Sequence, residues 1–236
     1  MTQSPASQPP ALQGLVSNED ILIQSLPTVS RLALAYAPAR ARRPTLALLA
    51  LDARLAHLLR QSREPMMAQL RLAWWRESLA QPAASWPDGE PLLAFLKSWN
   101  DAHAGLVPLV DGWEALTGAA PLPGSAMETM AEGRAHAFAT LADVLDRSAE
   151  RDVAALTARS WALSDLAMRL GHAEERQTAQ GLAHAARRGG MRLSRPLRPL
   201  LVLEGLAARR LAKGQDAAAT SPAAVLKAMR LGLLGF

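Results

Sequence analysis

The feature that most constrains the fold is residues 42–79, the longest uninterrupted part of the sequence with helical character. One set of leucines recurs there mainly at intervals of three and four: Leu48, Leu51, Leu55, Leu58 and Leu59. These intervals place the leucines on one side of an α-helix. Asp52, Ala56 and Arg60 are spaced by four and therefore stack on one side of the same helix. The sequence thus predicts a long helix that carries an acid, an alanine and a base one above the other.

A second helix follows at once. Pro65 suits its first turn, where the missing N–H costs nothing, and Glu64 suits the positive end of the helix dipole. Met67, Leu70 and Trp74 recur at helical spacing. We therefore expect these three side chains to face the core rather than to contact a ligand.

The rest of the chain also has the character of helices. Alanine, leucine and arginine dominate, β-branched residues are few, and no strand is predicted. Further helices are expected at 18–37, 92–102, 108–118, 125–147, 150–170, 173–188, 200–213 and from 222 onward. The fold class is therefore all-α. Residues 1–17 are polar and rich in proline and predict a disordered lead, which leaves 18–236 as a single domain.

Two helix starts have a recognisable capping pattern. Ser125 and Glu128 form the Ser-x-x-Glu pattern of a capping box. Ser221 precedes Pro222, the order expected of an N-cap followed by the first helical residue. A pair of glycines, Gly189 and Gly190, is expected to end the helix before it.

Composition excludes several classes of protein. The chain has no cysteine, which excludes disulfides, thiolate metal sites and cysteine nucleophiles. Its five histidines have no spacing that suits a helical metal site. The first residues lack the pattern of a signal peptide, and no run of ~18 apolar residues occurs. We expect a cytoplasmic protein, or one that associates with the surface of a membrane.

The net charge of +5 and the pI of about 10.6 raise the question of nucleic acid. The basic residues are scattered among acids, apart from the pairs Arg187-Arg188 and Arg209-Arg210, and the chain has only one tyrosine and three phenylalanines. Without an aromatic platform for bases, nucleic acid is not an expected partner. Anionic membrane surfaces or diphosphates are alternative partners that would explain the positive charge at least as well. The segment Arg192 to Arg198 is the basic stretch best suited to anionic lipid.

Three segments carry a resemblance to a known family. ALLALDARLAHLL at 47–59 and REPMMAQLRLAWWRESL at 63–79, followed by WALSDLAMRL at 161–170, resemble the squalene/phytoene synthase family. The string Arg-Leu-x-Trp-Trp-Arg is characteristic of the divergent branch that includes the mitochondrial complex I assembly factors. The resemblance implies an isoprenoid synthase-like helical bundle with a central cavity.

The resemblance also implies a chemistry. The family couples two prenyl diphosphates, and two Asp-x-x-x-Asp motifs on facing helices hold the magnesium that neutralises the leaving diphosphate. Here the first motif would fall on Ala56 and Arg60, with Asp52 one turn earlier, and the second has Asp165 but Arg169 in the partner position. Both motifs are therefore degenerate. No catalytic residue is assigned, and no metal or other cofactor is expected unless the chain is nevertheless an active synthase.

Asp52, Arg60, Asp165 and Arg169 are the candidate substrate-binding residues. In one interpretation the arginines bind a diphosphate or a phospholipid head group, since guanidinium offers fixed charge and paired donors. In the other they form ion pairs across the bundle, Arg60 with Asp165 and Arg169 with Asp52. The second interpretation is favoured, because a charge inside a helical bundle is usually paired.

These observations lead to three hypotheses on function. The first is a non-catalytic protein that binds a lipid or prenyl ligand, or a protein partner during assembly of a membrane complex. The second is an active prenyl transferase in isoprenoid biosynthesis with unusual metal ligands. The third is an arginine-rich helical module for an acidic partner, which would present a contiguous basic face.

Overall fold

The computed structural model describes residues 17–61, 65–187, 191–214 and 221–236. The expected disordered lead, apart from residue 17, lies outside these ranges, as do Glu64 and the glycine pair at 189–190. Within the described ranges the chain forms α-helices with short 3₁₀ and π turns and no strand, so the all-α prediction is confirmed. No helix in these ranges is long and apolar enough to span a bilayer.

Eleven α-helices are present among the described residues, against the ten helical segments expected. In chain order they are α1 (Asn18–Ser25), α2 (Thr28–Leu34), α3 (Ala39–Gln61), α4 (Pro65–Ala80), α5 (Pro91–Leu96), α6 (Val107–Ala115), α7 (Gly124–Val144), α8 (Arg151–Arg169), α9 (Ala173–Ala186), α10 (Arg198–Lys213) and α11 (Pro222–Met229). A π-helical segment, Arg230–Leu234, continues α11.

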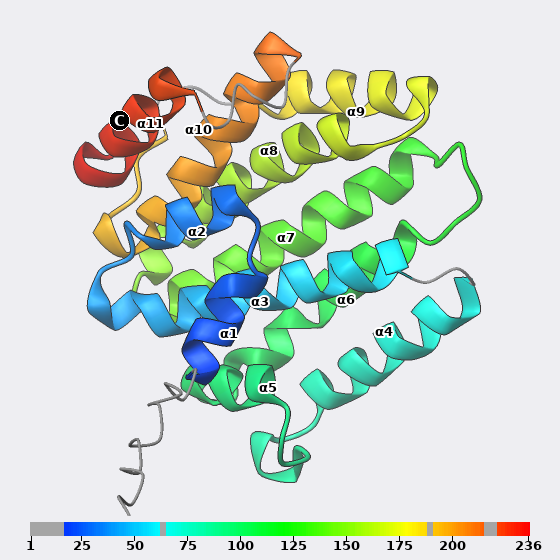
Figure 1. Cartoon of the computed structure of the whole chain (residues 1–236), viewed down its shortest axis with the longest axis vertical. Helices are drawn as coiled ribbons and strands as arrows, with labels where there is room; N and C mark the ends of the chain where they lie inside the picture. The colour runs from blue at the N-terminus through cyan, green and yellow to red at the C-terminus, as the bar shows by residue number, and fades with distance from the viewer. Residues whose placement is uncertain (1–16, 62–64, 188–190, 215–220) are drawn as a thin grey trace, which may run out of the picture.

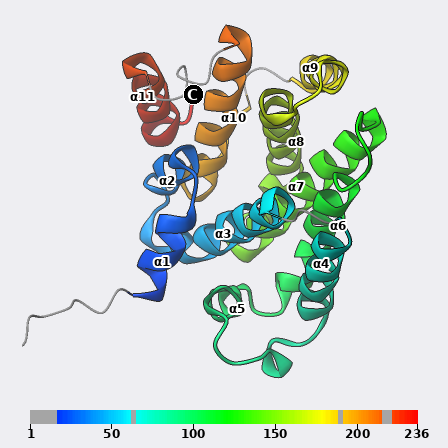
Figure 2. The same ribbon diagram turned by 45° about the vertical axis from the view of Figure 1, so that its right-hand side comes forward.

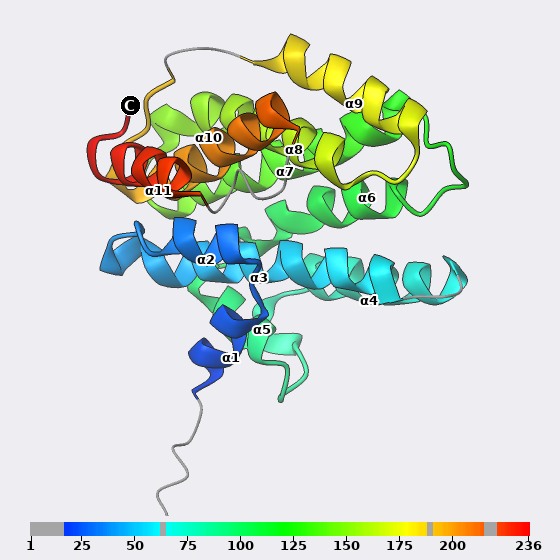
Figure 3. The same ribbon diagram turned by 45° about the horizontal axis from the view of Figure 1, so that its top comes forward.

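The long helices α7 and α8 pack against each other at the centre of the bundle. Helix α6 covers α7, while α9 and α10 pack on α8 (Figures 1 and 2). Seen from the side, α3 and α4 form a layer opposite the one that contains α8, α9 and α10 (Figure 3). Residues on α3, α7 and α8 can therefore meet in the interior.

Small residues set the distance between α6 and α7. Gly112 lies so close to α7 that an added Cβ would be 2.9 Å from the Cα of Met130. Helix α7 itself buries mainly alanines, which allows its neighbours to approach its axis closely. The close approach carries Trp113, the residue after Gly112, into the interior, where it is 6% exposed.

The expected helix at 18–37 is two helices. Helix α1 ends at Ser25, Leu26 is extended, and α2 begins after Pro27. Proline has no N–H to donate and disfavours helical geometry in the residue before it, so Pro27 divides the segment. This break places Pro27 beside α3 and α8, where it lines a cavity described below.

The expected inward stripe on α4 is wrong. Met67, Leu70 and Trp74 are 44%, 59% and 41% exposed, respectively. A different stripe is buried instead, made of Ala68, Leu72, Trp75 and Leu79. Both stripes have helical spacing, so periodicity alone does not distinguish them, and packing on α6 and α3 selects the second.

One predicted cap is confirmed and one is wrong. Ser221 caps α11, accepting the N–H of Ala224 at 3.3 Å. Ser125 does not cap α7, because that helix already begins at Gly124 behind an extended Pro123. A residue inside the first turn has helical backbone angles, which excludes the N-cap role expected of Ser125.

Candidate functional site

A buried arginine joins two of the predicted carboxylates. Arg134, on α7, donates from Nε and Nη2 to the two oxygens of Asp52 on α3, at 3.1 and 2.9 Å. Its Nη1 donates to Oδ2 of Asp165 on α8 at 3.1 Å. Arg134 is 2% exposed and Asp165 6% exposed, so the bridge between the three helices is shielded from water.

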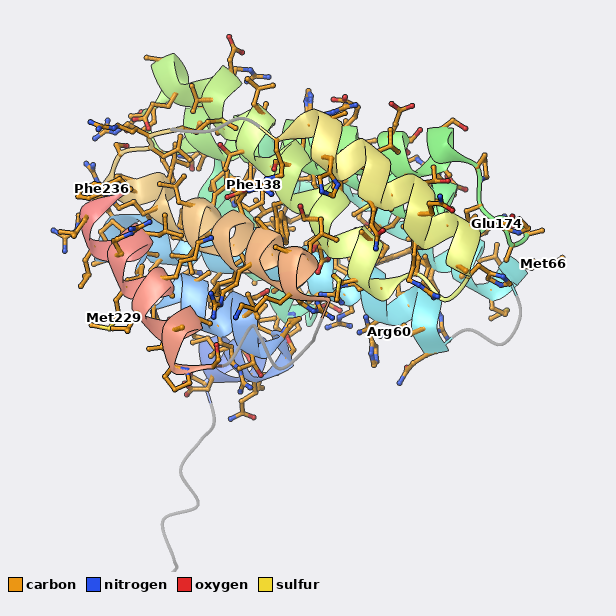
Figure 4. The ribbon with its side chains drawn as sticks, turned by 90° about the horizontal axis from the view of Figure 1, so that it is seen from above. Arg60, Met66, Phe138, Glu174, Met229 and Phe236 are labelled. Carbon is orange, nitrogen blue, oxygen red and sulfur yellow. The ribbon has the colours of Figure 1, made fainter. Side chains whose placement is uncertain are left out.

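Aromatic rings surround the bridge. Trp113 donates its indole N–H to Oδ1 of Asp52 at 2.9 Å. The guanidinium carbon of Arg134 lies 4.2 Å from the ring centroid of Trp161 and 5.4 Å from that of Trp113. Phe138 packs edge-on against Trp161 and lies inside the bundle (Figure 4). The cation thus has aromatic faces beside it as well as carboxylates, which favours its burial.

Asp165 is paired with more than one cation. Arg169, four residues later on α8, donates from Nε to Oδ1 at 2.8 Å, and Nη1 of Arg210 on α10 lies 3.9 Å from the same oxygen. Burial alone would raise the pKa of Asp165, but Arg169 and Arg134 reverse this effect and hold the pKa below its ordinary value. Burial likewise opposes the charge of Arg134, yet Asp52 and Asp165 raise its pKa. Both groups are therefore charged at neutral pH.

A cavity of about 340 Å³ lies beside the bridge, between α3, α8 and the α1–α2 turn. Its wall is mixed, and the apolar part includes Leu22, Leu49, Ala50, Ala53 and Trp161. Its charged lining includes Asp52, Arg60, Arg134 and Arg169. A second cavity of about 280 Å³, towards α10, shares Pro27, Ser30, Trp161 and Arg169 with the first. The two small cavities therefore meet at these four residues.

The structure brings three of the four candidate residues into one cluster and places the fourth at its edge. Asp52, Asp165 and Arg169 belong to the cluster around Arg134. Arg60 lines the same cavity but is exposed, near the end of α3 (Figure 4), and has no ion pair among the described residues. The expected pairs of Arg60 with Asp165 and of Arg169 with Asp52 do not form. The carboxylates are paired with arginines, but with different ones.

Arg134 was missing from the candidate residues, although the sequence contains a signal for it. Met127, Met130, Phe138 and Leu141 are buried on one side of α7, and Arg134 falls four residues from Met130 and four from Phe138. An arginine in the middle of an apolar stripe is costly unless a carboxylate faces it. The position therefore called for an acidic partner on a neighbouring helix.

The arrangement does not suit magnesium. Magnesium requires several oxygen ligands in near-octahedral geometry. Both oxygens of Asp52 and one of Asp165 already accept from Arg134, whose guanidinium lies between the two carboxylates. No group of three or more acidic or histidine side chains in the described ranges could hold a metal ion. A cation placed here would have to expel a buried arginine.

The electrostatic balance of the cavity favours anions. Among the described residues, its lining contributes one carboxylate, Asp52, and the arginines Arg54, Arg60, Arg134 and Arg169. Two of these are matched by Asp52 and Asp165, and Arg54 lies 3.5 Å from Glu90. Arg60 therefore adds positive charge at the edge of the cavity.

Searches against models of protein families, curated proteins and solved structures find no match for this chain.

Proposed function

We propose that this chain is a non-catalytic protein of the squalene/phytoene synthase type that binds one anionic amphiphile, a prenyl diphosphate or a phospholipid, in the cavity beside Arg134. The observation that carries the proposal is the position of Arg134. It occupies the space between Asp52 and Asp165, next to a cavity that has both an apolar wall and arginine side chains.

The same observation argues against catalysis. Ionisation of a prenyl diphosphate needs a strong electrophile at the departing diphosphate, and the family resemblance assigns that role to magnesium. Arg134 stands in the way of a metal between the two carboxylates, and its expulsion would leave buried charges unpaired. The cavity of about 340 Å³ is also at the lower end of the range of about 300–1,000 Å³ typical of ligand sites. One ligand suits this volume better than the two that a condensation requires.

The lining supports binding of an amphiphile. Leu22, Leu49 and Trp161 offer apolar surface for a hydrocarbon chain. Arg60 and Arg169 lie at the edge of that surface, and guanidinium groups match phosphate oxygens with paired donors. Arg60 is the main candidate for the head group, because Arg169 already donates to Asp165.

Binding is tested by titrating the full chain with farnesyl diphosphate, geranylgeranyl diphosphate and a short-chain phosphatidic acid, followed by calorimetry and tryptophan fluorescence. Inorganic pyrophosphate and farnesol serve as head-only and chain-only controls. Arg60→Gln should weaken binding of the complete ligand about tenfold, the equivalent of about 1.4 kcal/mol. Arg71→Gln, which changes an exposed arginine on α4, is the matched control.

Catalysis is tested with the same ligands plus magnesium, by following pyrophosphate release and C30 or C40 product by mass spectrometry. We expect binding without product. Product above a no-enzyme control would overturn the non-catalytic assignment and favour the active prenyl transferase. No binding by folded protein would overturn the ligand role and favour the remaining alternative, a protein that acts through a protein partner in assembly.

A further inference from the structure

Helix α11 and the π-helical segment after it expose large apolar side chains and bury small ones. The residues that face the rest of the protein are Ala224, Ala228 and Gly232, which are spaced by four. Six large apolar residues are 41–67% exposed: Val225, Leu226, Met229, Leu233, Leu234 and Phe236. A surface helix of a globular protein usually has the opposite arrangement, with its large apolar residues towards the core. We call these six residues the α11 surface.

Close packing fixes this orientation. Gly232 lies directly against the ring of Tyr36, and Gly205 on α10 lies against the side chain of Leu231, so a Cβ at either glycine would overlap its neighbour. Arg198 also donates a hydrogen bond to the carbonyl oxygen of Leu233. The helix cannot rotate its large side chains inward without losing these contacts. The exposed apolar side is therefore a property of the packed structure.

Positive charge is concentrated in the same part of the chain. Residues 177–236 contain ten arginines and lysines but only two acidic residues, a net charge of +8. The preceding 176 residues carry −3, which makes up the net +5 of the chain. The expectation that basic residues are scattered among acids is thus wrong for this last quarter.

Part of this charge lies next to the α11 surface. Arg192, Lys227 and Arg230 line a cavity of about 360 Å³ together with Phe236, and the only acid in that lining is Glu204. Arg230 is exposed and lies between Met229 and Leu231 on the helix itself. Figure 4 shows Met229 and Phe236 on the outer side of α11, far from Met66 at the opposite end of the molecule.

We propose that the α11 surface docks on an anionic lipid bilayer, with its large apolar side chains in the interface and Arg192 and Arg230 at the head groups. The exposed leucine, valine and methionine side chains suit acyl chains, and the single aromatic ring of this surface, Phe236, is not a platform for successive nucleic-acid bases. Arg192, Lys227 and Arg230, which lie next to this surface, complement an anionic membrane and would repel a second copy of the same surface. The proposal does not depend on a ligand in the central cavity.

The absence of cysteine allows a matched pair of labels. Leu226→Cys and Met66→Cys change residues of nearly equal exposure, 67% and 68%. Leu226 lies on α11 with Met229, and Figure 4 shows Met229 and Met66 at opposite ends of the molecule. Each full-length variant is labelled with a polarity-sensitive dye and mixed with vesicles of phosphatidylcholine, with or without phosphatidylglycerol. We expect a blue shift only for the label at 226, and only with phosphatidylglycerol present.

Flotation with the same vesicles measures affinity. Leu226→Ser/Leu233→Ser and, separately, Arg192→Gln/Arg230→Gln should each weaken binding about tenfold or more, because apolar burial and head-group attraction both contribute. The control Met66→Ser/Leu70→Ser should not change it.

Three results would overturn the proposal. The first is no binding to anionic vesicles by the folded chain. The second is an equal response of the control label or the control variant. The third is a stable dimer, detected by light scattering, that Leu226→Ser/Leu233→Ser dissociates, since the surface would then join two copies of the chain.

Discussion

Arg134 holds both oxygens of Asp52 through two separate nitrogens, at 2.9 and 3.1 Å, across the interface between α7 and α3. Paired donors of this kind fix direction as well as distance. The third guanidinium nitrogen reaches Asp165 on α8, so one side chain sets the relative position of three helices.

Removal of the Arg134 side chain should destabilise the folded protein. Arg134→Met leaves two carboxylates facing an apolar space, and we expect the free energy of unfolding to fall by about 3–5 kcal/mol. Urea denaturation followed by circular dichroism measures the change. Arg71→Met, at an exposed site on α4, should change it by less than about 0.5 kcal/mol. Equal losses in the two variants would contradict the structural role of the bridge.

The bridge also predicts a response to acid. The pKa of Asp165 is lowered in the folded protein, so the folded state binds fewer protons than the unfolded state once pH falls towards the ordinary value of 3.8. The stabilisation is complete above that value and is lost as pH decreases through the lower, folded pKa. Unfolding measured from pH 6 to pH 2 should show this loss. In Asp165→Asn the free energy of unfolding should depend less on pH within this range. The same pH dependence in Asp165→Asn and in the unchanged protein would exclude Asp165 as a source of the acid sensitivity.

The two adjacent tryptophans of α4 should differ in their contribution to stability. Trp75 is 3% exposed and Trp74 41% exposed. Trp75→Ala should therefore destabilise the fold by about 3–5 kcal/mol, as truncation of a buried aromatic side chain does. Trp74→Ala should cost less than about 1 kcal/mol. Thermal and urea unfolding of both variants test the assignment, and the reverse order would restore the inward stripe expected from the sequence.

Substitution of alanine for two helical glycines should change the stability of the protein in opposite directions. At Gly232 an added methyl group overlaps the ring of Tyr36, so Gly232→Ala should lower the free energy of unfolding by about 1–3 kcal/mol. At Gly181, in α9, no atom lies within 4 Å of the added Cβ. Gly181→Ala should therefore stabilise the protein by about 0.5–1 kcal/mol through helix propensity alone. A destabilising effect of similar size at both positions would show that α11 is not held by close contact with Tyr36.

Local signals in the sequence predicted many helix boundaries. Prolines at 65 and 222 begin helices as expected, and Ser221 supplies the predicted cap. These features depend on a few neighbouring residues, so the local sequence is sufficient to predict where these helices begin. The break at Pro27 was available from the same chemistry but was not predicted.

The partners within the site were harder to predict. Asp52 and Asp165 were both candidate residues, yet their shared partner Arg134 lies on a third helix and was not among the candidates. Which arginine reaches which carboxylate depends on the rotation of three helices about their axes, and no local pattern records that rotation. The same reason explains α4, where two stripes of equal periodicity compete and only contact with α3 and α6 selects one.

The position of Arg134 has a consequence for how the protein reaches its folded state in the cell. Guanidinium stays protonated at every physiological pH and belongs to the chain itself. Asp52 and Asp165 therefore receive their counter-charge during synthesis of the polypeptide, whatever ions the surroundings supply. Every charge in the Arg134 bridge between α3, α7 and α8 is therefore encoded in the sequence of the chain itself.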